Sequence, residues 1–349
     1  MTQRLLLWIG SYTSGSAAAA TGVQRVWLDP ADGRLSGAGT AAPAVDPSFL
    51  ATDGAGCVFA VNETMEGGVT GFVRTGEAAL AESGATHTGG SSPCHLLVHP
   101  AGRHVITANY GDGSLSVHPI TADGVPGTSI QRVEHTGSGP DRQRQEGSHA
   151  HSVCLAPGGT HLLVADLGTD ELRCHPFDPR SDQPLGAGHL AAQLEPGTGP
   201  RHLAVHRSGH IYVAGELDAR VHILRWDPDT ATAQPLAALP ATEDAPDVNY
   251  PAEIALSADG SRLYLSNRGP DSITTFAVTE DGAMLTRLAQ TPTGGTWPRH
   301  FAQVGDYIVV ANQNSATVTV LPVDPANGIP GPVRHSLELP SPVCVLPAV

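Results

Sequence analysis

The chain has 349 residues, of which 34 are acidic and 19 basic, so its formal net charge is −15. This balance excludes nucleic acid and anionic membranes as expected partners. Every basic residue is an arginine, and the absence of lysine excludes Schiff-base chemistry and the lysine-bearing phosphate loop of nucleotide hydrolases. The 40 glycines and 29 prolines, without a long apolar run, favour many short strands joined by turns.

The apolar stretch from Leu5 to Ile9 is too short for the core of a signal peptide. Five cysteines are scattered along the chain without a CxxC pair. Both features indicate a reduced protein of the cytoplasm. We expect a monomer or a weak homo-oligomer, a choice that the sequence leaves open.

One pattern recurs along the chain: an anchor residue, an alternating apolar strand, a Gly-bearing turn, a second apolar run, a small polar cluster and a third run. The anchors are Pro47, Pro93, His149, Pro200, Pro251, Pro298 and Pro342. Their spacings of 44 to 56 residues, with no sustained 3.6-residue stripe, predict an all-β fold. We expect one seven-bladed β-propeller domain over residues 1–349, with four strands per blade.

The two chain ends are expected to complete one blade together. Pro342 is followed by a single strand, Val343 to Leu346, whereas the N-terminal segment 5–28 supplies further strands that belong to no other anchor. The C-terminal strand should therefore be innermost in a blade whose other strands are N-terminal. This closure removes the free strand edges that invite aggregation.

Antiparallel connectivity places the anchors and the polar clusters on one face of the disc, around its central mouth, because the first strand crosses the disc and the second returns. Two positions after the anchors stand Phe49, His95, His151, His202, Glu253, His300 and Cys344. A second predicted ring contains Glu63, Asn109, Asp166, Glu216, Arg268 and Asn312. Arg201 and Arg299 stand one position after their anchors. An acidic chain thus gathers Arg and His on one rim.

The segments IGSYTSG, PSFLATD, HAHSV, GPRHLAVH, LYLSNRGPDSI and WPRHF resemble the lactonase family of seven-bladed propellers. This family includes 6-phosphogluconolactonases and the fungal carboxy-muconate lactonising enzyme. The resemblance implies a catalytic set of His151, Arg201, Glu216 and Arg268. It also implies a hydrolase that opens a small anionic lactone, foremost 6-phospho-D-glucono-1,5-lactone of the pentose phosphate pathway, without a cofactor.

Lactone hydrolysis needs an activated water, a stabilised oxyanion and a proton for the leaving hydroxyl. We expect His151 to act as the base, with Glu216 as its partner or as the proton carrier. Arg201 and Arg268 are expected to bind anionic groups. The candidate substrate-binding residues are His149, His95, His202, Arg299 and Glu63.

Alternatives stand beside these assignments. His95, His202 and His300 could equally serve as capping or core residues, and Asp166 and Asp170 could hold their own loop. No metal is expected, because histidines from separate blades converge on one ion only with difficulty. The competing functions are a lactonase or lactonising enzyme for another organic acid, such as a muconate-type lactone, and a non-enzymatic interaction platform.

Overall fold

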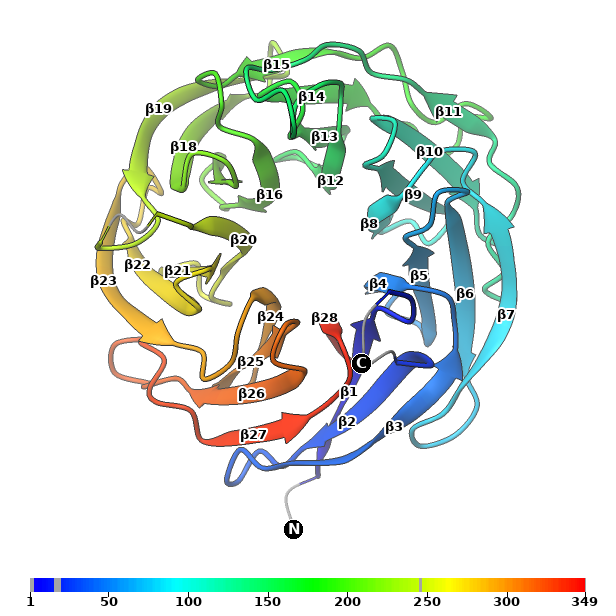
Figure 1. Cartoon of the computed structure of the whole chain (residues 1–349). Coiled ribbons are helices and arrows are strands. Elements are labelled where there is room, and N and C mark those ends of the chain that lie inside the picture. Colours follow the sequence, from blue (N-terminus) through cyan, green and yellow to red (C-terminus); the bar gives the residue numbers. More distant parts are fainter. Residues whose placement is uncertain (1–2, 16–19, 245–246, 349) are drawn as a thin grey trace.

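The computed structural model describes residues 3–15, 20–244 and 247–348. Within these ranges the chain forms 28 strands and no helix, and the strands make seven four-stranded antiparallel sheets. Figure 1 shows the sheets as blades around one central axis. In six of the blades, the strand that comes first in the chain lies nearest the axis. The predicted seven-bladed, four-stranded propeller is confirmed. No helix of the described residues is long and apolar enough to span a membrane.

The first three blades follow one another in the chain. Blade 1 contains β4 (Pro47–Thr52), β5 (Cys57–Asn62), β6 (Gly68–Arg74) and β7 (Leu80–His87). Blade 2 contains β8 (Pro93–Val98), β9 (His104–Asn109), β10 (Ser114–Pro119) and β11 (Gln131–Val133). Blade 3 contains β12 (Ala150–Leu155), β13 (His161–Asp166), β14 (Glu171–Pro176) and β15 (His189–Gln193).

The next three blades repeat this order. Blade 4 contains β16 (Pro200–Val205), β17 (His210–Gly215), β18 (Arg220–Asp227) and β19 (Thr232–Pro240). Blade 5 contains β20 (Tyr250–Leu256), β21 (Arg262–Arg268), β22 (Ser272–Val278) and β23 (Leu285–Pro292). Blade 6 contains β24 (Pro298–Val304), β25 (Tyr307–Asn312), β26 (Thr317–Pro322) and β27 (His335–Glu338).

Blade 7 is built from both ends of the chain, as the sequence predicts. Its order is β28 (Pro342–Pro347), β1 (Leu5–Ser11), β2 (Gly22–Leu28) and β3 (Leu35–Pro43). The C-terminal strand β28 is innermost and pairs with β1, with Trp8 opposite Leu346 and Gly10 opposite Cys344. The ring is therefore closed by backbone hydrogen bonds between the two ends.

The core lies between the blades, because each second strand is covered on both faces. All six residues of β9 and of β17 are buried. Leu163 of blade 3 packs in one cluster with Val213 of blade 4, and Leu7 of blade 7 packs with Val309 of blade 6. Each such side chain contributes about 1.5–3 kcal/mol by leaving water. No blade can thus bury its apolar faces alone.

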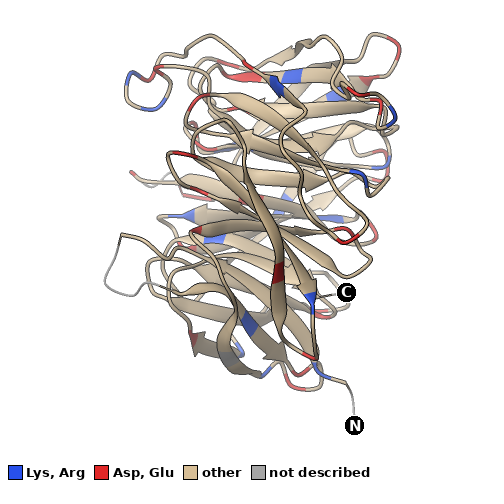
Figure 2. Ribbon diagram, turned by 90° about the vertical axis from the view of Figure 1, so that its right-hand side faces the viewer, with Lys and Arg blue, Asp and Glu red and all other residues tan. Residues whose placement is uncertain are grey.

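The turns between first and second strands lie on the far face, and glycine permits them. Gly102 and Gly260 occupy equivalent turns with φ of 67° and 75°, a left-handed conformation that side chains with a Cβ rarely adopt. On the side drawn in Figure 2, acidic and basic residues are interspersed along the ribbon.

A charged substitution in the closing strand β28 tests how much the stability of the whole ring depends on this strand. Val345 is 2% exposed and packs in the cluster that contains Leu7 and Val309. Val345→Asp is expected to lower the free energy of unfolding by about 4 kcal/mol, because it buries an unpaired carboxylate. Urea denaturation measures this change. Leu288→Asp, on the outermost strand of blade 5 with 40% exposure, is the control. Equal effects of the two substitutions would contradict the closure argument.

Candidate active site

The strand pairing sets the anchor of blade 3 at Ala150, so the prediction of His149 is wrong by one residue. Ala150 pairs with Asp166 in the way that Pro93 pairs with Asn109 in blade 2. The error arose because blade 3 has no proline at this position. His149 instead precedes the strand, and its carbonyl accepts the Leu167 N–H.

This register changes which residues are equivalent. The residues two positions after the anchors form an axial ring: Phe49, His95, Ser152, His202, Glu253, His300 and Cys344. The residues one position after the anchors form a second set, the anchor-plus-one ring: Ser48, Cys94, His151, Arg201, Ala252, Arg299 and Val343. His151 therefore shares its structural position with Arg201 and Arg299, and not with the other three histidines that the sequence analysis grouped with it.

The polar residues after the second strands occupy two positions rather than the single ring that the sequence analysis expected. The partners of the anchors are Asn62, Asn109, Asp166, Gly215, Asn267 and Asn312. The residues that follow them are Glu63, Tyr110, Leu167, Glu216, Arg268 and Gln313. Glu63 and Glu216 donate their backbone N–H groups to the carbonyls of Asp46 and Gly199, which precede the anchors. These bonds hold the later position at the mouth.

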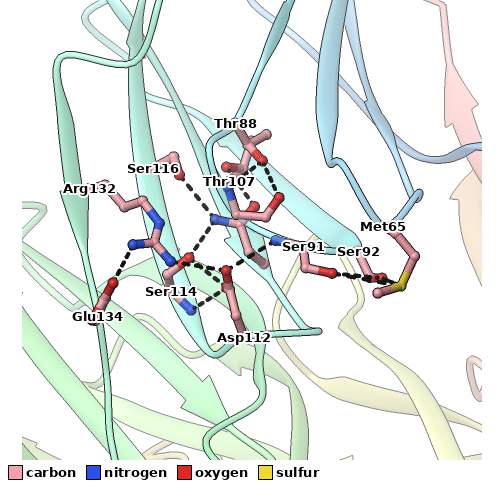
Figure 3. A network of polar contacts seen from close by, with 12 residues as sticks. Met65, Thr88, Ser91, Ser92, Thr107, Asp112, Ser114, Ser116, Arg132 and Glu134 are labelled. Atoms are coloured by element: carbon pink, nitrogen blue, oxygen red, sulfur yellow. Dashed lines mark hydrogen bonds and ion pairs between the residues drawn. The ribbon is translucent and has the colours of Figure 1, made fainter.

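Three of the anchor partners, Asn109, Asn267 and Asn312, are fully buried and bind the third strand of their own blade. Asn109 Nδ2 donates to the hydroxyls of Ser114 and Ser116, each at 3.0 Å, and Asn312 Nδ2 donates to Thr319 at 3.0 Å. Figure 3 shows Ser114 and Ser116 in this network in blade 2, which continues through Asp112 to the surface. The recurrence of Asn at this position therefore has a structural explanation.

A single carboxylate, that of Glu216, lies among three guanidinium groups. Arg268 Nη2 donates to its Oε2 at 2.6 Å, Arg201 Nε lies 3.1 Å from the same oxygen, and Arg144 Nη2 pairs with Oε1. Burial alone would raise the pKa of Glu216, but Arg268 and Arg201 hold it well below its usual range. Glu216 is thus a permanent anion that holds the three cations together.

Arg201 is the residue of this cluster with unused hydrogen-bonding capacity. It is 2% exposed, and within the described residues neither its Nε nor its Nη1 has a hydrogen-bond partner. Burial lowers the pKa of Arg201 to about 9, which leaves it cationic at neutral pH. Nε is engaged in the ion pair with Glu216, whereas Nη1 is unpaired. Because an unpaired buried donor is costly, Nη1 is suited to donate to an anionic oxygen.

His151 lies beside this cluster as a neutral imidazole. Burial, and then the charge of Arg201, lower the pKa of His151 well below its usual value. Its ring centroid is 5.5 Å from that of Tyr110 and 5.3 Å from that of His202. The Cys94 thiol donates to the His151 carbonyl at 3.3 Å. The His151 imidazole is therefore unprotonated, is flanked by the rings of Tyr110 and His202, and lies next to a cation.

Five side chains of the axial ring pack against each other on the axis. The Phe49 ring centroid lies 4.1 Å from that of His95 and 5.6 Å from that of His300. Glu253 Oε2 is 2.7 Å from His202 Nδ1 and 3.4 Å from His300 Nε2. Burial raises the pKa of Glu253 to about 8, so this carboxyl is mostly protonated at neutral pH. The axial ring thus closes the bottom of the mouth with uncharged groups.

A second polar group, Tyr12, Glu63 and Arg299, joins blades 7, 1 and 6 across the mouth. The Tyr12 hydroxyl donates to Glu63 Oε2 at 2.9 Å, and Arg299 Nη2 lies 3.8 Å from the same oxygen. The Arg299 guanidinium carbon is 5.5 Å from the centroid of the Tyr12 ring. The Tyr12 N–H also donates to the Ser341 carbonyl, which ties this group to the closing strand.

The other sequence candidates lie around this centre. His149 stacks on Tyr110 with ring centroids 4.6 Å apart, and its Nδ1 is 2.7 Å from the Tyr110 carbonyl. Asp166 accepts hydrogen bonds from Ser148 and from the His149 N–H, so it holds its own loop. Nine of the predicted residues therefore lie at the mouth or on the axis directly below it: His151, Arg201, Glu216, Arg268, His149, His95, His202, Arg299 and Glu63.

Sequence reasoning missed Arg144, Tyr12 and Tyr110. Arg144 comes from the 134–149 segment between β11 and β12, a segment outside the repeat. Tyr110 and Glu63 have the same position in their blades, which correct alignment on the anchors would have revealed. Tyr12 was a visible part of the SYTSG loop, but it belongs to the blade that both chain ends share.

Among the residues that the structure describes, no group of three or more His, Cys, Asp or Glu side chains is placed to hold a metal ion. The mouth instead combines four guanidinium groups, two carboxylates and a protonated one, and neutral imidazoles. A propeller with such a mouth belongs to the class of proteins that bind small anions and have groups suited to acid–base chemistry.

Comparison with known proteins places the chain in a family. Its sequence matches the family described as "Lactonase, 7-bladed beta-propeller" over residues 6–347, and the chain belongs to this family. It is 29% identical to the 6-phosphogluconolactonase of Bacillus subtilis over 97% of both chains. It is 34% identical to that of Xenorhabdus nematophila over 68% of this chain and 69% of the relative.

Among solved structures, the chain is similar to a periplasmic gluconolactonase of Pseudomonas aeruginosa. The TM-score is 0.90 at 29% sequence identity, and the match covers 99% of each chain. The resemblance drawn from the sequence motifs is thereby confirmed.

The buried neutral histidines predict that acid destabilises the protein. Burial lowers the pKa of His95 and His300 to about 3, and those of His151 and His202 fall as well. In the unfolded chain these imidazoles titrate near 6.5, so the stability they contribute is lost as the pH falls below that value. At pH 5 each of these histidines therefore lowers the free energy of unfolding by about 2 kcal/mol. Urea unfolding should show a free energy several kcal/mol lower at pH 5 than at pH 7.

Glu253 changes the stability of the protein with pH in the opposite direction to the histidines, and it supplies a control. Its pKa is raised by burial to about 8, so its contribution is greatest at low pH and is lost as the pH rises through 8. Glu253→Gln removes this offset and should make the loss between pH 7 and pH 5 larger by about 2–3 kcal/mol. A wild-type protein that is equally stable at both pH values would contradict neutral burial of the histidines.

Proposed function

We propose that the protein is a lactone hydrolase that converts 6-phospho-D-glucono-1,5-lactone to 6-phosphogluconate. The observation that carries this proposal is Arg201, whose buried Nη1 has no hydrogen-bond partner among the described residues and lies in the cluster beside the neutral imidazole of His151. Membership of the lactonase family and similarity to proteins named 6-phosphogluconolactonase support the same reaction.

The charge at the mouth favours a substrate with a phosphate group. Four arginines, Arg144, Arg201, Arg268 and Arg299, face the two carboxylates of Glu216 and Glu63. Because Glu253 is mostly protonated at neutral pH, the mouth carries about two excess positive charges within a protein of net charge −15. A phosphate monoester, with a charge near −2, matches this excess.

We assign the base to His151. Its imidazole is neutral at physiological pH, because burial and the charge of Arg201 lower its pKa. An oxyanion that forms beside Arg201 offsets that charge, so the imidazole can accept a proton from water as that water attacks the lactone carbonyl. The carbonyl oxygen becomes an oxyanion next to Arg201, whose unpaired Nη1 can donate to it. When the tetrahedral intermediate collapses, the ring C–O bond breaks. The imidazolium then returns its proton to the leaving oxygen.

Glu216 is assigned a positioning role in place of the proton-carrying role that the sequence analysis left open. A carboxylate whose pKa lies well below its usual range is a poor proton acceptor near neutral pH. Its two oxygens are already bound to Arg268, Arg201 and Arg144. Glu216 thus fixes the guanidinium groups against which the substrate binds.

We also propose that the protein works in the cytoplasm as a monomer or weak homo-oligomer. All five cysteines are free, which agrees with a reducing compartment. The similarity to a periplasmic gluconolactonase makes localisation a necessary test. Fractionation of the cells and light scattering of the purified protein would decide these two points.

Substitution of the base tests the mechanism. His151→Gln should lower kcat by about 10²–10⁴-fold with 6-phospho-D-glucono-1,5-lactone, because an amide cannot take up the proton of the attacking water. The assay follows 6-phosphogluconate formation on fresh lactone, above spontaneous hydrolysis. His161→Gln, at the start of β13 on the far face, is the control. If His151→Gln retains most of the rate, the assignment fails. If the wild type does not accelerate hydrolysis, the proposed function fails.

A further inference from the structure

One guanidinium of the mouth is carried by a segment that the other blades lack. Residues 134–149 connect β11 to β12, and Arg144 lies within this link. Every other link between successive blades in the described part of the chain has at most nine residues. The insertion thus brings one additional arginine to the mouth.

Buried hydrogen bonds hold this loop in place next to Arg144. Gln145 is fully buried, and its Nε2 donates to Asp170 Oδ1 at 2.7 Å and to the Leu167 carbonyl at 2.9 Å. Asp170 also accepts from the N–H groups of Gly197 and Gly199, each at 2.7 Å. Asp170 therefore links the loop that carries Arg144 to the segment that leads into Arg201.

Arg144 differs from the other two guanidinium groups on Glu216 in its exposure. The side chain of Arg144 is 36% exposed, whereas those of Arg201 and Arg268 are 3% and 6% exposed. Arg144 binds Oε1, while the other two bind Oε2. If Arg144 turns toward a ligand, Glu216 retains two partners and Arg144 remains at the solvent side of the mouth.

A phosphorylated sugar lactone has a reactive carbonyl at one end and a charged phosphate at the other, which corresponds to the buried and the exposed guanidinium groups of the mouth. Its carbonyl must reach the buried His151 and Arg201, while the phosphate at the far end of the molecule can remain near solvent. A guanidinium binds phosphate through two parallel N–H···O bonds. The exposed, loop-borne guanidinium is therefore suited to the phosphate, and the two buried ones to the lactone end.

We propose that Arg144 binds the phosphate of the substrate and so determines the preference for phosphorylated over unphosphorylated lactones. This inference rests on the proposed function, which supplies the reaction at the buried end of the site. Arg144 is accordingly a specificity-determining residue, and its loss should affect one substrate much more than another.

The test compares Arg144→Gln with the wild type on two lactones. With 6-phospho-D-glucono-1,5-lactone, kcat/KM should fall at least 30-fold, mainly through KM. With D-glucono-1,5-lactone it should change less than threefold. The affinity for 6-phosphogluconate, measured by calorimetry, should fall by a factor similar to that in KM, whereas D-gluconate binding should not change. Arg144→Lys keeps the charge without the bidentate geometry and should recover part of the loss.

Arg142→Gln is the matched control, because Arg142 is an exposed arginine of the same loop and its loss changes the net charge equally. It should leave all these quantities unchanged. Thermal unfolding of each variant confirms that the fold is retained. Equal losses on both lactones would show that Arg144 only positions Glu216, and would overturn the inference. An unchanged KM for the phosphorylated lactone would also overturn it.

The outcomes separate this inference from the proposed function. If the wild type hydrolyses neither lactone, the proposed function fails. Binding of 6-phosphogluconate that is weakened by Arg144→Gln but not by Arg142→Gln would still support the phosphate subsite. If the wild type is active and Arg144→Gln shows no selectivity, the proposed function stands and the phosphate subsite is rejected.

Discussion

The antiparallel order of strands within each blade is the constraint on which the rest of the structure depends. It sets the start of every innermost strand at the same end of the axis, so that one position of the repeat appears seven times around one mouth. At the anchor-partner position, side chains from three blades do the same work, because the buried Asn109, Asn267 and Asn312 each bind a third strand. In the anchor-plus-one ring they do not, because His151, Arg201 and Arg299 stand where other blades have Ser48 or Ala252. The scaffold is repetitive and the site is not.

Burial of so many ionisable groups is tolerated because their charges are balanced locally. Glu216 alone would be a costly buried anion, and Arg201 and Arg268 would be costly buried cations. Together they satisfy much of one another's charge, and the remaining excess is positive. The axial ring below avoids the same cost by a different route, since its histidines are neutral and Glu253 carries a proton. The charged cluster around Glu216 thus lies next to an axial ring of uncharged groups.

The sequence was sufficient for the architecture because the signals were repeated. Six proline anchors and the alternating strands gave the blade number, and the lone strand after Pro342 gave the closure. Prediction was weaker where repetition ended. In blade 3 the anchor is Ala150 and a 16-residue segment precedes it, so the register was misplaced by one residue and Arg144 was overlooked. The charge state of Glu216 was also beyond reach, because it depends on three arginines from different segments.

The seam of the ring passes through the site. Tyr12 follows β1, its N–H binds the carbonyl of Ser341 just before β28, and its hydroxyl binds Glu63 of blade 1, beside Arg299 of blade 6. A ligand that contacts these side chains therefore joins blades 6, 7 and 1 next to the place where the two chain ends meet. By thermodynamic linkage, ligand occupancy and ring integrity reinforce each other. We therefore expect ligand binding to stabilise the noncovalent contacts between the two chain ends.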